Sequence, residues 1–98
     1  MKKKLNEKQI VALFEQASEV FGLEERLAKM IEESGEVIVE ILKANRSDDL
    51  IPTIKEIIDV NIVSGSLLVH FGIDFRSELY QEKLLKLKRA IDKANAKH

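Results

Sequence analysis

The sequence predicts an all-α fold, and three observations support this prediction. Apolar residues recur at helical spacing in four stretches, and no stretch alternates cleanly between apolar and polar residues over six positions. The connections between the four stretches are short, which is typical of antiparallel neighbours. A chain of 98 residues is expected to form a single domain over residues 1–98. Because so short a chain has a poor surface-to-volume ratio, we expect a four-helix subunit that gains further burial by assembling with other copies.

The first two helices are expected on either side of Gly22. The first runs from about Glu7 to Phe21, with Asn6 as its N-cap and Gly22 as its end. The second runs from about residue 24 to residue 44. The apolar stripes are Ile10, Leu13, Phe14, Ala17 and Phe21 on the first helix, and Leu27, Met30, Ile31, Ile38, Ile41 and Leu42 on the second.

The other two helices follow a turn at residues 45–48, where Ser47 or Asp48 can cap the third helix. The third helix runs from about residue 49 to residue 71 and ends at Gly72, and Pro52 lies in its first turn, where a missing N–H costs little. The fourth runs from about residue 75 to residue 94, with Asp74 as its cap. Its inner stripe is expected to consist of Leu79, Tyr80, Leu84, Leu87 and Ile91.

The third helix is apolar on two opposite sides. With about 100° of rotation per residue, Ile54, Ile58, Ile62, Leu68 and Val69 share one side, which we expect to face the bundle core. The opposite side carries Val60, Val63, Leu67 and Phe71, and we expect it to contact a partner subunit. Glu56 and Asp59 lie on this second side, so they are expected at the mouth of the subunit contact.

Five carboxylates occur at spacings that place them on shared helix faces. Glu33 and Glu36 are three residues apart, Glu32 and Glu36 are four apart, and Glu56 and Asp59 are again three apart on the next helix. Two such sets facing each other would supply hard oxygen donors, which suit Mg²⁺ beside a phosphate chain. No histidine lies within either set, which argues against zinc and against di-iron bundles.

At these residues the sequence resembles the MazG-like all-α nucleoside triphosphate pyrophosphohydrolases. The family motif is Glu-Glu-x-x-Glu followed by Glu-x-x-Asp, matched here by EESGE from Glu32 to Glu36 and by EIID from Glu56 to Asp59. Lys29 precedes the first motif by one turn, as in the family's frequent Lys-x-x-Glu-Glu pattern. Further matches are Val60, GID at 72–74 and EKL at 82–84, so that the resemblance covers roughly residues 24 to 91.

The resemblance implies a hydrolase that cleaves the α–β phosphate bond of a nucleoside triphosphate, with Mg²⁺ (or Mn²⁺) as cofactor, in nucleotide housekeeping. It also implies a homodimer or homotetramer. We assign metal binding to Glu33, Glu36, Glu56 and Asp59, and orientation or deprotonation of water to Glu32. Candidates for phosphate contact are Lys29, Lys83, Lys86 and Arg89, because cations offset the charge of a triphosphate.

Two features of the sequence leave substrate choice open. Gly35 lies between candidate metal ligands and would admit either a close helix or a phosphate. There is no tryptophan and there are only five aromatic residues, so no base-stacking partner stands out among Phe14, Phe21 and Tyr80, each of which is equally a core residue.

Composition narrows the classes of protein to which the chain could belong. The absence of cysteine removes disulfides and thiolate chemistry, and no apolar run reaches the ~18 residues of a membrane helix. The first residues lack the apolar stretch of a signal peptide, so we expect a cytoplasmic protein with no membrane partner. The chain carries six basic residues and one acidic residue from 83 to 98, but the balanced total charge makes nucleic-acid binding a weak case.

Three alternatives stay open at this point. The first is a non-catalytic helical oligomerisation module with a degenerate metal site. The second is a relative that acts on another nucleotide such as phosphoribosyl-ATP. The third is a nucleic-acid binder that uses its basic last helix, which would bind in a salt-sensitive manner.

Overall fold

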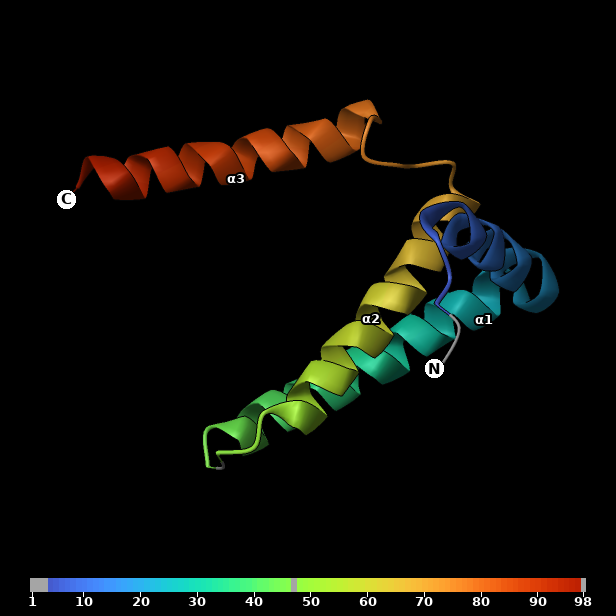
Figure 1. Cartoon of the computed structure of the whole chain (residues 1–98), viewed down its shortest axis with the longest axis horizontal. Helices are drawn as coiled ribbons and strands as arrows, with labels where there is room; N and C mark the ends of the chain where they lie inside the picture. Colours follow the sequence, from blue (N-terminus) through green and yellow to red (C-terminus); the bar gives the residue numbers. More distant parts are fainter. Residues whose placement is uncertain (1–3, 47, 98) are drawn as a thin grey trace.

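The computed structural model describes residues 4–46 and 48–97, and this part of the chain is helical without a strand. It contains three helices, α1 (Glu7–Ala44), α2 (Ile51–His70) and α3 (Glu78–Ala96). Figure 1 shows α1 and α2 lying side by side and α3 leading away from them. The all-α prediction is confirmed, whereas the structure has three helices rather than four because the first two predicted helices are joined end to end.

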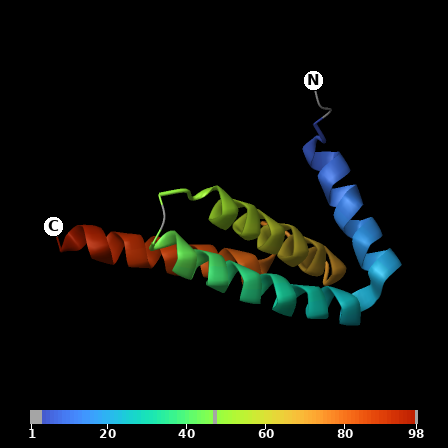
Figure 2. The same cartoon turned by 90° about the horizontal axis from the view of Figure 1, so that it is seen from below.

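The joint lies at Gly22, the residue predicted to end the first helix. Its backbone adopts φ 80° and ψ 167°, outside the helical region and in a range open to glycine. The short arm before Gly22 therefore points away from the rest of α1 (Figure 2). On the other side of the bend, Arg26 is buried, forms a two-bond pair with Glu25 and places its guanidinium 4.8 Å from the centre of the Phe21 ring.

The start of α1 follows the sequence prediction. The side chain of Asn6 accepts the N–H of Gln9 at 2.8 Å, and the Gln9 side chain accepts the N–H of Asn6 at 2.9 Å. This reciprocal arrangement satisfies two backbone donors that the first helical turn leaves unpaired. Asn6 is thus the predicted N-cap, and it makes a complete capping box.

The antiparallel α1–α2 pair holds the core of the described chain. Val63 and Leu67 of α2 are its buried apolar residues, at 5% and 9% exposure, and Ser66 between them is fully enclosed. The arm of α1 packs on the same end of α2, where the ring of Phe14 lies so close to Gly65 that an added Cβ would come within 2.6 Å of it. The prediction that the second and third helical stretches pack side by side is confirmed.

The two sides of α2 are reversed relative to the sequence prediction. Val63 and Leu67, predicted to face a partner subunit, are the residues that contact α1. Ile54, Ile58 and Ile62, predicted to form the core, are about half exposed. The reason is that Glu56 and Asp59 share a side with Val63, and this side turns toward the carboxylates of α1.

The connection from α2 to α3 begins at Gly72, as predicted. The N–H of Gly72 donates to the carbonyl of Val69 at 3.0 Å, and the N–H of Ile73 donates to the carbonyl of Leu68 at 2.8 Å. This pattern, with φ 71° at Gly72, is a Schellman ending. Asp74 is not the cap of the last helix, because it lies in the connecting turn and accepts the N–H of Arg76.

The last helix, α3, packs against neither α1 nor α2 and contains no buried residue. Its predicted inner stripe is therefore not an inner surface within one chain: Leu79, Leu84, Leu87 and Ile91 are exposed. Tyr80 alone is half-buried, in edge-to-face contact with Phe75. No helix in the described residues is long and apolar enough to cross a membrane.

Candidate metal centre

Carboxylates from α1 and α2 meet in the middle of the pair. One set consists of Glu32, Glu33 and Glu36, and the other of Glu33, Glu56 and Asp59. Within each set, one oxygen from every residue lies within 4.8 Å of the others. The two sets share Glu33, so all five predicted carboxylates belong to one cluster that joins the two helices.

Glu33 lies at the centre of this cluster and is the most enclosed of its members. Its exposure is 6%, and its Oε2 atom has no hydrogen-bond partner. Oε2 of the half-buried Glu56, on the facing helix, also lacks a partner. A buried carboxylate oxygen without a donor is costly, since water has been removed and nothing replaces it. Both orphan atoms would be satisfied by a cation.

Electrostatic repulsion within the cluster changes the pKa of Glu36. The nearby charge of Glu33, followed by loss of solvent and the charge of Glu56, raises the pKa of Glu36 above its ordinary value. Like charges this close disfavour ionisation, and an added cation reverses that effect. Glu36 and Glu32 are exposed, so one side of the cluster is open to solvent.

Lys29 is the single cation paired with the cluster among the described residues. Its Nζ lies 3.3 Å from Glu33 and 3.6 Å from Glu32, and the hydrogen bond to Glu33 is the main cause of a raised Lys29 pKa. Lys29 therefore neutralises part of the charge of α1. It does not reach the Oε2 atoms of Glu33 and Glu56 that lack partners.

The predicted phosphate-binding cations of the last helix lie elsewhere in the subunit. Lys83, Lys86 and Arg89 are exposed on α3 and form no ion pair with the cluster in the described chain. His70 also lies outside the cluster, since Nδ1 of its ring is hydrogen-bonded to Oγ of Ser18. One chain thus brings the five carboxylates and Lys29 together and leaves the other three cations apart.

A surface hollow opens over the exposed side of the cluster. Its lining consists of Glu32, Gly35, Glu36, Val39, Glu40 and Glu56. A Cβ added at Gly35 would meet nothing within 4 Å, so no helix of this chain packs closely there. The space beside Gly35 is therefore open in one chain, where either a ligand or a helix of another copy could occupy it.

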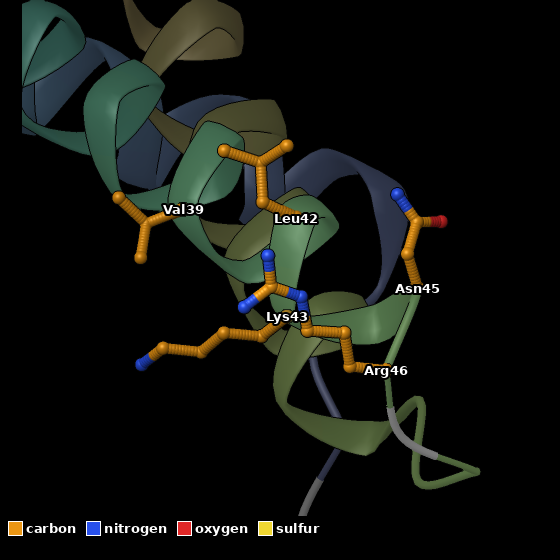
Figure 3. Close-up of a pocket in the computed structure, with 5 residues that line it drawn as sticks. All are labelled: Val39, Leu42, Lys43, Asn45 and Arg46. Carbon is orange, nitrogen blue, oxygen red and sulfur yellow. The ribbon is translucent and has the colours of Figure 1, made fainter.

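A second hollow adjoins the first along α1. It is lined by Val39, Leu42, Lys43, Asn45 and Arg46, and Figure 3 shows Arg46 folded back between Leu42 and Lys43, with the Lys43 side chain extending toward the side of Val39. Val39 lines both hollows. No sequence pattern assigns a role to Lys43 or Arg46. The spacing of seven residues nevertheless places Lys43 on the same face of the helix as Glu36.

Comparison of the chain with protein-family models, with curated proteins and with solved structures finds no match among them. The resemblance to the MazG-like family therefore rests on the motif residues alone.

Proposed function

We propose that the protein is a Mg²⁺-dependent nucleoside triphosphate pyrophosphohydrolase that converts a nucleoside triphosphate into a monophosphate and pyrophosphate. The observation that carries the proposal is the buried Glu33, which shares a cluster with Glu56 and, like Glu56, has an Oε2 atom without a hydrogen-bond partner. Carboxylates held this way, at the edge of an open hollow, suit a divalent cation that must also be reached by a phosphate chain.

The carboxylates divide into those that hold the cation and one that acts on water. Glu33, Glu36, Glu56 and Asp59 would hold Mg²⁺, with Mn²⁺ as a substitute. The cation supplies charge neutralisation to the triphosphate and to the transition state. Glu32 lines the hollow and is exposed, which supports assigning it the orientation of the attacking water and the acceptance of its proton.

The remaining cations depend on how the subunits assemble. We propose a homodimer or homotetramer in which the exposed stripe of α3, formed by Leu84, Leu87 and Ile91, packs on another copy. At about 100° per residue, Lys83 borders this stripe, about 70° from its centre, whereas Lys86 and Arg89 lie on the far side of α3. Lys83 is then the predicted α3 cation best placed to approach a phosphate.

The proposal is tested by a panel of canonical and modified triphosphates, assayed for pyrophosphate release with Mg²⁺ or Mn²⁺. Release is expected for at least one triphosphate and should be lost in Glu33→Gln and Glu56→Gln, while Glu19→Gln on the exposed arm of α1 behaves as the unsubstituted protein. Phosphoribosyl-ATP is included because a related site would accept it. Absence of pyrophosphate release from every compound, by a protein that still assembles, would instead favour a non-catalytic oligomerisation module.

The proposed reaction would serve the nucleotide pool of the cytoplasm, where triphosphates and Mg²⁺ are both abundant. We do not propose a sequence-reading role for nucleic acid, since the exposed groups of the cluster are carboxylates, which repel a phosphate backbone unless a cation intervenes.

A further inference from the structure

The hollow over the carboxylates continues into a basic hollow at the end of α1. Four glutamates line the first, and Lys43 and Arg46 line the second, with Val39 common to both. Figure 3 shows both cationic side chains extending over the same surface of α1 as Val39. The surface therefore changes from negative to positive along the helix within a few turns.

The lysine points back toward the carboxylates. Lys43 follows Glu36 by seven residues, or about 10 Å along the helix axis, but its Nζ pairs with Oε1 of Glu40 at 3.4 Å. Glu40 is only four residues, about 6 Å, beyond Glu36. The ammonium group thus reaches to about one helical turn from the cluster, which is within the span of a phosphate chain that begins at a cluster-bound cation.

The two ends of the cluster differ in the cations that they offer. At the near end, Lys29 is held by both Glu32 and Glu33. At the far end, Lys43 has one carboxylate contact and a side chain that is 68% exposed, and Arg46 forms no ion pair with a described residue. The positive charge still available to an anion is therefore greater at the far end.

We propose that Lys43 and Arg46 bind the terminal phosphates of the triphosphate, so that the phosphate chain runs along α1 from the carboxylate cluster toward its last turn. This inference rests on the proposed function and adds an orientation to it. Arginine offers a planar fork that matches two phosphate oxygens, and lysine adds a mobile point charge. The nucleoside would then lie toward Lys29, and the site would favour triphosphates over diphosphates.

The test measures binding rather than turnover. Inorganic tripolyphosphate and pyrophosphate are titrated by calorimetry into the Mn²⁺-loaded protein, its Lys43→Gln/Arg46→Gln variant, and a Lys4→Gln/Lys8→Gln control that loses the same charge on the arm of α1. The Lys43→Gln/Arg46→Gln variant is expected to bind tripolyphosphate at least roughly tenfold more weakly, because it loses two charged contacts and one alone is worth about that much. Pyrophosphate affinity should change less, and Mn²⁺ affinity should not change.

In turnover, the same variant should show a higher KM for triphosphates with an unchanged kcat. Equal tripolyphosphate affinity for the Lys43→Gln/Arg46→Gln variant and its control, with Mn²⁺ still bound, would overturn the orientation and leave the proposed function standing. Failure of the unsubstituted protein to bind Mn²⁺ would overturn the proposed function and this inference together.

Discussion

The α1–α2 pair and α3 are both amphipathic, yet they use their apolar residues in opposite ways. The pair encloses five described residues, and three of these, Arg26, Glu33 and Ser66, are polar. In contrast, α3 encloses none and exposes its whole leucine and isoleucine stripe. The pair is therefore organised around polar side chains, and α3 carries apolar surface that a single chain does not cover.

This difference agrees with the two roles proposed above, a binding site on the α1–α2 pair and a subunit contact on α3. A helix pair that buries Glu33 at the centre of an acidic cluster loses stability unless the charge is compensated, which is the expected cost of a binding site. An uncovered apolar stripe of this length is more typical of a subunit contact than of a monomer surface. The half-exposed Ile54, Ile58 and Ile62 of α2 extend the uncovered surface to the pair itself.

The largest effect is expected from a charge in the stripe of α3. If the protein assembles through this stripe as proposed, Leu84→Asp should convert it to a monomer, because an unpaired carboxylate cannot be buried in a subunit contact. The adjacent Leu85→Asp, about 100° away on the helix, should leave assembly intact. Sedimentation or light scattering gives the mass. If the unsubstituted protein is monomeric at micromolar concentration, the stripe of α3 does not form a subunit contact, and the proposed difference between the two regions is wrong.

The reversal of the α2 faces gives the next largest effect. In the Leu84→Asp background, where a single chain is measured, Leu67→Ala should lower the free energy of unfolding by roughly 2–3 kcal/mol because Leu67 is buried against α1. Ile58→Ala should lower it by less than about 1 kcal/mol, since half of its side chain is already exposed. Urea titration provides both values, and the opposite ranking would restore the original assignment of the core side.

Two glycines on the helix pair provide a smaller contrast. Gly65→Ala should destabilise the fold by about 1–2 kcal/mol, because the new methyl group displaces the Phe14 ring. Gly35→Ala meets no neighbour and should stabilise α1 by up to about 1 kcal/mol. Thermal unfolding measures both. If Gly35→Ala also weakens triphosphate binding, the space at Gly35 is used by ligand.

The smallest effect concerns pH and Glu36. Because its pKa is raised in the folded chain, stability without divalent cation should fall as pH rises from below 4.5 through that raised value. Glu36→Gln removes this cost, so its Tm should exceed that of the unsubstituted protein at pH 7 and equal it at pH 4. The order at pH 7 should reverse when Mg²⁺ is added. A difference independent of pH would show that Glu36 acts through packing.

Sequence periodicity predicted much of this structure, and its failures have physical causes. The ends at Gly22 and Gly72 and the cap at Asn6 follow from local backbone chemistry, which a sequence displays directly. The prediction that the five carboxylates lie together is confirmed, because helical spacing determines which side chains share a face and because the two helices are neighbours. Periodicity shows that a helix has two apolar sides, but it does not show which side the neighbouring helix occupies.

The same limit explains the errors at α3 and at the basic hollow. An amphipathic stripe predicts burial without saying whether the cover comes from the same chain or another, so Leu84 and Leu87 were expected inside. Lys43 and Arg46 belong to no motif, and their position next to the carboxylates is seen only in the shared lining at Val39 and in the pair between Lys43 and Glu40. Side-chain direction at the end of a helix is decided by local contacts such as the Lys43–Glu40 pair.

The central claim is that Glu33 and Glu56 together hold a divalent cation, and direct Mn²⁺ binding tests it most simply. Electron paramagnetic resonance of free Mn²⁺, titrated with the protein at pH 7, should reveal saturable binding that Mg²⁺ displaces. Glu33→Gln/Glu56→Gln should lower Mn²⁺ affinity more than roughly 100-fold, because loss of a residue that only hydrogen-bonds to a metal ligand already lowers metal affinity ~10–100-fold. Glu19→Gln should bind Mn²⁺ normally. Equal Mn²⁺ affinity in these two variants, with both folded, would contradict the account.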